Sequence, residues 1–377
     1  MVSKNRMINL FTELVRYDSE SFGERKIGKY VEERLKALGL ELLTKDGTDP
    51  AFMEAHPDSY PNIHARLKGT GSGKPVLFSA HLDTVSPGKR KQFTVTDDGV
   101  IRSAGHTVLG ADDISGIVSI IEALTVIREE NLKHPDIEVL ITAAEEPFCE
   151  GSRYFRFDRI RARTAYVLDL TGPVGTAAVG APSIVTFRAE ILGRAAHAGF
   201  APETGINALE IAVKTLGSVR TGRVDEYTTV NFGTITGGTA DNVVPERVRI
   251  TGEVRSIIRG EAERIADRIL ERFAMDAGEA GGDAFCDRTE HIRAYQVAED
   301  DPAVLRFRKA CRLENIPCSV IRTMGGSDAN RLNEAGIRTI VIACGMENVH
   351  STEEFCKLSE LNRSAKLTLR LMTMESE

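Results

Sequence analysis

Hydrophobic and polar positions follow two periods along this chain. From Leu10 to Leu38 apolar residues recur at helical spacing, and this pattern predicts two amphipathic helices that end before Gly39. From residue 62 the period shortens, and apolar runs at 75–84, 137–146, 164–170, 318–323 and 338–345 are typical of buried strands. A helical pattern over 114–130 lies between the first two runs. This alternation predicts a three-layer α/β/α domain with a mainly parallel sheet.

Residues 181–295 have a different pattern. Strand-like segments at 183–194, 228–238, 247–256 and 285–293 enclose helical segments at 206–219 and 260–273. The order β-α-β-β-α-β predicts a small two-layer α+β domain of the ferredoxin-like kind. Because the earlier pattern resumes afterwards, we expect this domain to be inserted between two parts of the sheet domain, 1–180 and 296–377.

Composition narrows the classes of protein to consider. The 377 residues carry 48 Lys and Arg against 55 Asp and Glu, a formal net charge of −7 without a long basic block, so a nucleic-acid partner is not expected. The six cysteines are scattered without a C-x-x-C pair, which favours reduced thiols. No apolar run reaches the roughly 20 residues of a membrane span, and charges interrupt the N-terminal segment. We therefore expect a cytoplasmic protein without a membrane partner.

Acidic residues and histidines gather at the carboxyl ends of the predicted strands and beside one helix start. Open α/β sheets place their ligand sites at this edge. The residues concerned are His81, Asp83, Asp112, Asp113, Glu145, Glu146, Asp169 and His350. So many carboxylates close together would repel one another unless cations were bound among them. Mixed histidine and carboxylate ligands suit zinc, with cobalt or manganese as alternatives, and a shared carboxylate would hold a pair of ions.

Six motifs give the chain a resemblance to a known family. They are S-A-H-L-D-T, L-G-A-D-D-x-x-G, E-E-x-x-x-x-G-S, V-L-D, G-R-A-A-H-A-G and N-V-H-S-x-E. In this order they resemble the co-catalytic zinc exopeptidases, and the segments 138–152 and 325–337 are most similar to the peptidase T-like branch. The resemblance implies the three-layer catalytic domain predicted above, with an inserted lid or dimerisation domain.

The resemblance also implies a role for each residue of the metal centre. His81, Asp112 and Asp169 would hold one Zn²⁺, while Asp112, Glu146 and His350 would hold the other. Glu145 would be the general base. Asp83 would accept the imidazole N–H of His81 and so determine its tautomer.

Other residues would contact the substrate. In relatives the histidine that matches His197 polarises the scissile carbonyl, often across a dimer interface, so a homodimer is expected. Asn242 and Arg255 match substrate-contacting positions, with Arg255 expected to bind a carboxylate. Gly325 and Gly326 are expected beside the substrate, and Ser327 stands where peptidase T-like sequences usually have Thr.

The expected function is hydrolysis of small peptides, as by a di- or tripeptide aminopeptidase. An N-acyl amino acid amidohydrolase could use the same centre, because its substrate presents the same planar amide. Two further alternatives are a serine hydrolase with Ser327 in a nucleophile elbow and His350 downstream, and an inert metal-binding scaffold. The serine hydrolase alternative does not explain the acidic residues at the strand ends. The scaffold alternative would be favoured if the general base or a metal ligand were missing, and here all of them are present.

Overall fold

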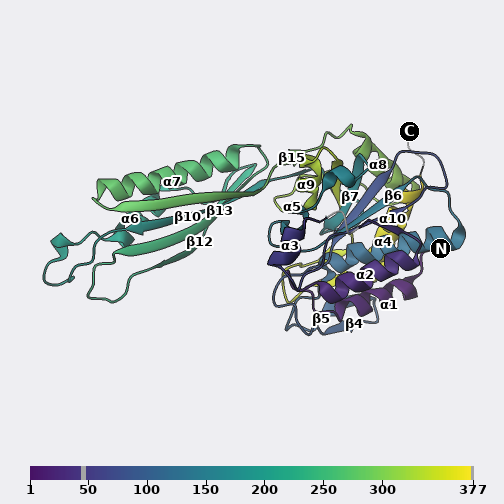
Figure 1. Ribbon diagram of the computed structural model, residues 1–377, viewed down its shortest axis with the longest axis horizontal. Helices are drawn as coiled ribbons and strands as arrows, with labels where there is room; N and C mark the ends of the chain where they lie inside the picture. The colour runs from purple at the N-terminus through teal and green to yellow at the C-terminus, as the bar shows by residue number, and fades with distance from the viewer. Residues whose placement is uncertain (44–47, 375–377) are drawn as a thin grey trace. The chain divides into compact units, whose positions relative to one another are not determined.

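The computed structural model describes residues 1–43 and 48–374, and the chain divides into two compact units (Figure 1). The first unit contains residues 1–180, 296–323 and 327–377. The second contains residues 181–295 and 324–326. The chain passes between them near two short paired strands, β9 (Gly180–Ala181) and β15 (Tyr295–Gln296).

An eight-stranded sheet forms the centre of the first unit. Its strands, in spatial order, are β1 (Glu41–Leu42), β2 (Ile63–Leu67), β6 (Ile137–Thr142), β3 (Val76–His81), β7 (Thr164–Leu170), β17 (Arg338–Ala343), β8 (Thr176–Ala178) and β16 (Ser319–Ile321). The run β6-β3-β7-β17 is parallel, as is β8-β16, whereas β1-β2, β2-β6 and β17-β8 are antiparallel. The sheet is therefore mainly parallel, as the buried runs predict.

Helices cover both faces of this sheet. They are α1 (Lys4–Val15), α2 (Arg25–Ala37), α3 (Pro50–Ala55), α4 (Ala111–Glu130), α5 (Glu150–Arg153), α8 (Pro302–Leu313), α9 (Asp328–Glu334) and α10 (Leu358–Thr373). Helix α4 packs on β3 and β7 and is covered by α1 and α10, while α9 packs on β7 and β17. Figure 1 shows α4 and α9 on either side of β7, so the unit has three layers. None of the helices in the described ranges is both long and apolar enough to cross a membrane.

Helix α4 is apolar almost all round because it lies between the sheet and other helices. Its Ile117 is fully buried, and in the sheet beneath it the rings of Phe78 and Tyr166 stack with centroids 5.6 Å apart. The sequence predicts a start at residue 114. In the structure α4 extends back to Ala111, but the backbone angles of Asp112 and Asp113 are not helical. Regular helix therefore begins just after the two aspartates.

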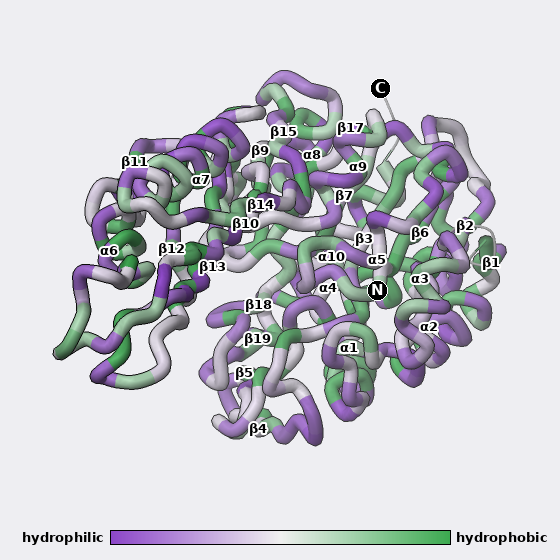
Figure 2. Tube along the Cα trace, turned by 60° about the vertical axis from the view of Figure 1, so that its left-hand side comes forward, coloured by the Kyte–Doolittle hydropathy of each residue, from purple (hydrophilic) through white to green (hydrophobic). Residues whose placement is uncertain are grey.

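A small four-stranded sheet was not expected from the sequence. It has the order β18 (Met346–Glu347), β19 (Phe355–Lys357), β5 (Val100–Ser103) and β4 (Phe93–Val95). In Figure 2 hydrophilic colour dominates the chain around β4, whereas hydrophobic stretches surround β6. These strands are short, and the pairing of β5 with β19 joins segments about 250 residues apart, so their sequence carries little strand signal.

The second unit has the predicted two layers with one additional strand. Its antiparallel sheet has the order β11 (Gly222–Asp225), β12 (Thr228–Gly237), β13 (Arg247–Ser256), β10 (Ser183–Leu192) and β14 (Asp283–Ile292). Helices α6 (Ala208–Ser218) and α7 (Glu261–Glu279) pack on one face. Alternate residues of β10, such as Val185 and Phe187, meet Ala266 and Phe273 of α7 in the core.

One buried acid in this unit gives a testable prediction of stability. The carboxylate of Asp276 lies 2.8 Å from Lys214 Nζ and 2.8 Å from an Arg272 nitrogen, and it accepts a 2.7 Å hydrogen bond from Thr215. Burial alone would raise the pKa of Asp276, but these three contacts lower it to about 2. Because the pKa is lower in the folded state, the stabilisation is present above the unfolded pKa of about 3.9 and is lost as the pH falls toward 2.

We therefore expect Asp276→Asn to lower the free energy of unfolding by about 2 kcal/mol at pH 7, and by progressively less below pH 4. Urea unfolding followed by circular dichroism at both pH values measures this. Glu279→Gln is the matched control, because Glu279 contacts the same Lys214 at 2.8 Å but has a side chain that is 60% exposed. Equal destabilisation at pH 7 and pH 3 would contradict the prediction.

Candidate active site

The strand ends of the first unit bring the predicted metal ligands together. His81 is the last residue of β3, and Asp169 is the penultimate residue of β7. Glu146 follows β6, Asp112 lies at the start of α4, and His350 lies between β18 and β19. Since β6, β3 and β7 are parallel neighbours, their carboxyl ends meet at one edge, as the sequence predicts.

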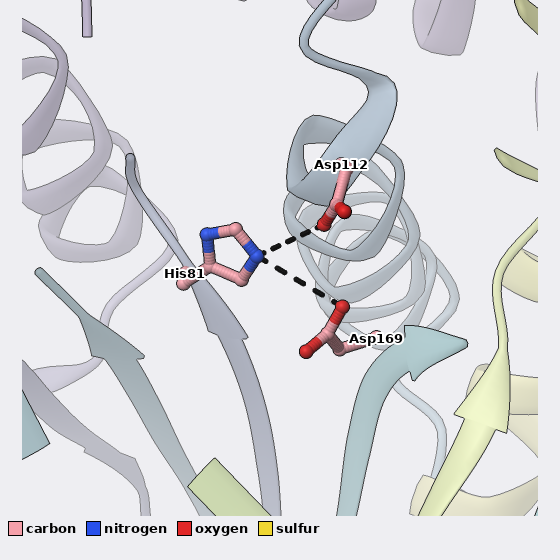
Figure 3. A group of neighbouring side chains, drawn as sticks. All are labelled: His81, Asp112 and Asp169. Carbon is pink, nitrogen blue, oxygen red and sulfur yellow. Dashed lines mark hydrogen bonds and ion pairs between the residues drawn. The ribbon is translucent and has the colours of Figure 1, made fainter. Parts of the chain in front are cut away.

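The first cluster consists of His81, Asp112 and Asp169 (Figure 3). The Nε2 atom of His81 lies 3.0 Å from Asp112 Oδ1 and 3.9 Å from Asp169 Oδ1. Figure 3 shows both carboxylates directed at this one ring nitrogen. The other ring nitrogen, Nδ1, lies 3.0 Å from the backbone carbonyl of Asp83. That carbonyl can only accept, so Nδ1 carries a proton and the ring keeps its orientation.

The second cluster consists of Asp112, Glu146 and His350. His350 Nε2 lies 3.2 Å from Asp112 Oδ2 and 3.0 Å from Glu146 Oε2. Asp112 therefore presents one oxygen to each cluster. In each cluster the potential ligand atoms lie within 4.8 Å of one another. This is the arrangement that a carboxylate shared by two ions requires.

The electrostatics of the clusters favour bound cations. Burial raises the pKa of Asp169 well above its usual value, and the charge of Asp112 raises it further. Contacts with Asp112 and Glu146 raise the pKa of His350 to about 10. Protons thus partly compensate the crowded negative charge, and divalent ions that replaced them would do so more completely.

One oxygen of Glu146 provides a direct test of whether metal ions fit. Its Oε1 atom is buried and has no hydrogen-bond partner among the described residues, although its other oxygen contacts His350. A buried carboxylate oxygen without a partner is costly, and a cation would remove that cost. The donor set of two imidazoles and three carboxylates without sulfur suits Zn²⁺, Co²⁺ or Mn²⁺. The residues present therefore fit a pair of divalent ions.

Asp83 connects the histidine to the glutamate pair. Its carboxylate accepts hydrogen bonds from the backbone N–H of Glu145 at 2.8 Å and of Glu146 at 3.1 Å, and from the hydroxyl of Ser21 at 2.7 Å. It lies 3.4 Å from His81 Nδ1, farther than its own backbone carbonyl. Its main structural effect is thus to hold the turn that carries both glutamates.

That turn separates the two glutamate side chains. Ala144 has a positive φ of 45°, so the chain bends sharply after β6. Glu146 points into the second cluster, whereas the buried carboxylate of Glu145 accepts a 3.4 Å contact from Cys149 Sγ. Burial raises the pKa of Glu145 well above its usual value, and the charges of Asp328 and Glu146 add to this. These surroundings make the carboxylate of Glu145 a stronger proton acceptor than an exposed glutamate.

Sequence reasoning missed two buried glutamates that support the site. Glu354 accepts hydrogen bonds from the backbone N–H groups of Leu109, Gly110 and Asp112 at 2.6, 2.7 and 2.9 Å, so it anchors the start of α4. Burial raises its pKa to about 7. The acidic pair at 353–354, three and four residues after His350, was an available signal that resembles the pair at 145–146.

The second missed residue is Glu24. It accepts the N–H of Ala144 at 3.0 Å and the hydroxyl of Ser59 at 2.6 Å, and so supports the bend that carries the glutamate pair. Burial and the charge of Asp83 raise its pKa to about 7. No motif in the sequence marks this residue, because its partner is a backbone group 120 residues away.

Within the second unit, His197 and Asn242 are neighbours. The carbonyl of Asn242 accepts the N–H of Ala198 at 3.0 Å, and His197 forms a β-bridge with Val243. The Nδ1 atom of His197 is the acceptor for the N–H groups of Gly199 and Phe200, at 3.1 and 3.2 Å. The neutral ring therefore carries its proton on Nε2, which is available as a donor.

Arg255 and the two glycines also lie together in the second unit. Gly326 packs closely, because a Cβ there would lie 2.1 Å from the terminal methyl group of Ile292, which would have to shift. Arg255 donates at 3.1 Å to the carbonyl of Met324, directly before Gly325. Its guanidinium also forms two hydrogen bonds with Glu253, at 2.7 and 3.0 Å. The guanidinium expected to bind a substrate carboxylate is thus paired with a carboxylate of the chain itself.

The structure gives Ser327 a capping role rather than that of a nucleophile. It is the N-cap of α9 with extended backbone angles, its Oγ accepts the N–H of Ala329, and Asn330 completes a capping box. The histidine required by the serine hydrolase alternative, His350, contacts Asp112 and Glu146 instead. The serine hydrolase interpretation is therefore not supported.

Comparison with known proteins identifies the family to which this fold belongs. The model of peptidase family M20/M25/M40 matches residues 77–374. The uncharacterized protein YqjE of Bacillus subtilis is 34% identical over 99% of both chains. The crystal structure of aminopeptidase PepT from Bacillus cereus is 35% identical with a TM-score of 0.91, and that of a tripeptidase from Staphylococcus aureus is 31% identical with a TM-score of 0.94. Each covers 99% of this chain, and the alignment covers 98% of each of those chains.

These matches confirm the resemblance seen in the motifs, and they extend over the sheet domain and the insert alike. The chain belongs to peptidase family M20/M25/M40 and is a hydrolase of peptide bonds.

Proposed function

We propose that this protein is an aminopeptidase of small peptides that depends on two divalent ions, with zinc as the native metal. The observation that carries the proposal is the pair of clusters that share Asp112, with the buried carboxylate of Glu145 beside them. The similar PepT of Bacillus cereus and tripeptidase of Staphylococcus aureus support the substrate class. A cytoplasmic location stays a prediction.

His81, Asp112 and Asp169 would hold one ion, and Asp112, Glu146 and His350 the other. The ions would supply Lewis acidity, which polarises the scissile carbonyl and acidifies the attacking water. Glu145 accepts the proton of that water and returns it to the departing amine. Asp83 keeps the turn of Glu145 and Glu146 in place through the two backbone hydrogen bonds described above.

The first test is removal of metal. Dialysis against a chelator is expected to abolish hydrolysis of di- and tripeptides, and added Zn²⁺ or Co²⁺ should restore it, because Glu145 alone cannot deprotonate water fast enough near neutral pH. Elemental analysis should give two ions per chain. Full activity of a protein verified as metal-free would contradict the proposal.

The same assay separates the two substrate classes. Peptides with a free amino terminus are compared with N-acyl amino acids at equal concentration. We expect the peptides to be hydrolysed with the higher kcat/KM. A preference for N-acyl amino acids would show that the protein is an amidohydrolase and not an aminopeptidase. It would not change the proposed metal centre. Two bound ions without hydrolysis of either class would indicate the inert scaffold.

We further propose that His197 donates its Nε2 proton to the oxygen of the scissile carbonyl, either after closure of the chain's own insert or from a partner subunit. Exposed apolar side chains of the second unit support a homodimer through this unit. Phe200, Val213 and Phe285 are 85%, 58% and 62% exposed.

His197→Ala is expected to lower kcat by about 10²–10³ with both ions retained, as loss of one oxyanion donor does. Mixing this variant with Glu145→Gln subunits should restore part of the activity if His197 acts across a dimer. Failure after verified subunit exchange would mean that each chain uses its own His197. An unchanged kcat for His197→Ala would remove His197 from the mechanism.

A further inference from the structure

A cavity of about 1100 Å³ opens in the first unit at the end of the sheet opposite to the candidate active site. It is lined at the starts of β3, β7 and β17, where Val76, Thr164 and Arg338 lie in register on adjacent parallel strands. The metal ligand His81 ends β3, five residues after Val76. At about 3.3 Å per residue the two sites are separated by roughly 16 Å of strand.

Helix α8 contributes one wall of this cavity. One face of this helix carries Leu305, Arg308, Lys309 and Arg312, which stand at positions i, i+3, i+4 and i+7, and all four line the cavity. Arg306 lines it as well. Four cationic side chains of one short helix thus face the same space.

The starts of the strands contribute three more cations, Lys74, Arg163 and Arg338. Arg163 directly precedes β7, and Arg338 is the first residue of β17. Asp301 is the single carboxylate among the residues that line the cavity. Seven cationic groups therefore face one acidic group in a chain whose net charge is −7.

Acids in the described part of the chain pair with some of these cations. Asp301 lies 3.0 Å from Arg338, and Glu299 pairs with Arg308. Within residues 1–43 and 48–374, no ion pair involves Arg163 or Arg312.

Arg306 binds two backbone carbonyl groups at the end of α10. It donates to the backbone carbonyls of Leu371 and Met374 at 2.8 and 2.6 Å. Burial lowers its pKa, so an anion in the cavity would stabilise its charged form.

The cavity also has apolar lining residues, which would contact an uncharged part of a ligand. Val76, Leu305, Val320 and Met374 lie among the cations. A guanidinium group can bind two oxygens of one phosphate at the same time. Several arginines around one cavity therefore favour a ligand with more than one phosphate group. The cavity volume of about 1100 Å³ is close to that of sites for small molecules, since ligand pockets commonly have about 300–1,000 Å³.

We propose that this cavity binds a small molecule that carries two or more phosphate groups on an apolar or planar body, such as a nucleoside polyphosphate. The site is separate from the metal centre and does not depend on the proposed peptidase mechanism. Because it lies at the amino ends of the strands that carry His81 and Asp169, its ligand is not the peptide substrate.

Isothermal titration of the metal-loaded protein at low salt tests the proposal, with ATP, pyrophosphate and adenosine as probes. We expect binding of ATP, weaker binding of pyrophosphate, and still weaker binding of adenosine. Arg163→Glu/Arg312→Glu should weaken ATP binding by about a hundredfold or more, because two charged hydrogen-bonding groups are lost. Arg163→Gln/Arg312→Gln, a milder change, should weaken it by about tenfold or more. Raising the salt concentration should weaken binding in the wild type.

Arg268→Glu is the matched control, because Arg268 is an exposed residue of α7 outside the cavity, and it should bind ATP like the wild type. All variants should keep their bound metal and their peptide hydrolysis, which shows that they are folded. ATP binding that persists in both double variants would place the phosphates at the metal centre and overturn the proposal. Absence of ATP binding to the wild type would also overturn it, as would binding only to RNA or to anionic phosphatidylglycerol vesicles.

Discussion

Glu145→Gln is expected to lower kcat for peptide hydrolysis by about 10²–10⁴ while both ions stay bound. The amide is nearly isosteric with the carboxylate, but it cannot accept the proton of the attacking water. Among the described residues no hydrogen bond or ion pair joins the side chain of Glu145 to His81, Asp112, Asp169 or His350, so its replacement by the nearly isosteric amide should leave these four side chains in place. The measurements are kcat and KM for a tripeptide, together with elemental analysis of the same preparation.

Glu146→Gln is the matched control for this prediction. It makes the same chemical change one residue along the chain, but it removes a carboxylate that contacts His350 at 3.0 Å. We expect this variant to lose metal as well as activity. If Glu145→Gln lost metal and Glu146→Gln retained it, the roles of base and ligand would have to be exchanged.

Asp112→Ala is expected to have the largest effect, with loss of both ions and hydrolysis reduced to background. Asp112 is the residue common to both clusters, with one oxygen 3.0 Å from His81 and the other 3.2 Å from His350. Its removal also leaves each cluster with only one carboxylate. Metal content and peptide hydrolysis are measured at increasing Zn²⁺ concentration.

Asp97→Ala serves as the control for Asp112→Ala, because Asp97 is an exposed acid of the same unit outside both clusters. It should retain both ions and full activity. Retention of one ion by Asp112→Ala would show that the two clusters bind metal independently. Retention of two ions would exclude Asp112 as the shared ligand.

Residues at strand ends could be predicted from the sequence because their placement follows from the strands themselves. The runs that end at His81, Glu146 and Asp169 are apolar and uninterrupted, so they must be buried in a sheet with helices on both faces. In a parallel sheet the ends of such strands meet at one edge. Histidines and carboxylates gathered at that edge then indicate a metal centre, and this prediction does not depend on the conformation of the loops.

The supporting residues could not be predicted in the same way. Glu354 acts on Asp112 through a backbone hydrogen bond between segments 242 residues apart, and Glu24 acts on Ala144 across 120 residues. Such contacts depend on the assembled packing and leave no local period or motif. The pairing of β5 with β19 escaped sequence reasoning for the same reason.

The sequence by itself determined the layered α/β class, and it indicated an insert and a group of candidate metal-binding residues, because these depend on local periodicity and side-chain chemistry. Tertiary structure decided which oxygen of Asp112 faces which histidine, and which glutamate of the adjacent pair enters a cluster. It also assembled the basic cavity from α8 and three strand starts. Each of these features joins side chains from segments that are distant in the chain. No local sequence pattern encodes the relative orientation of such segments, so tertiary packing decides it.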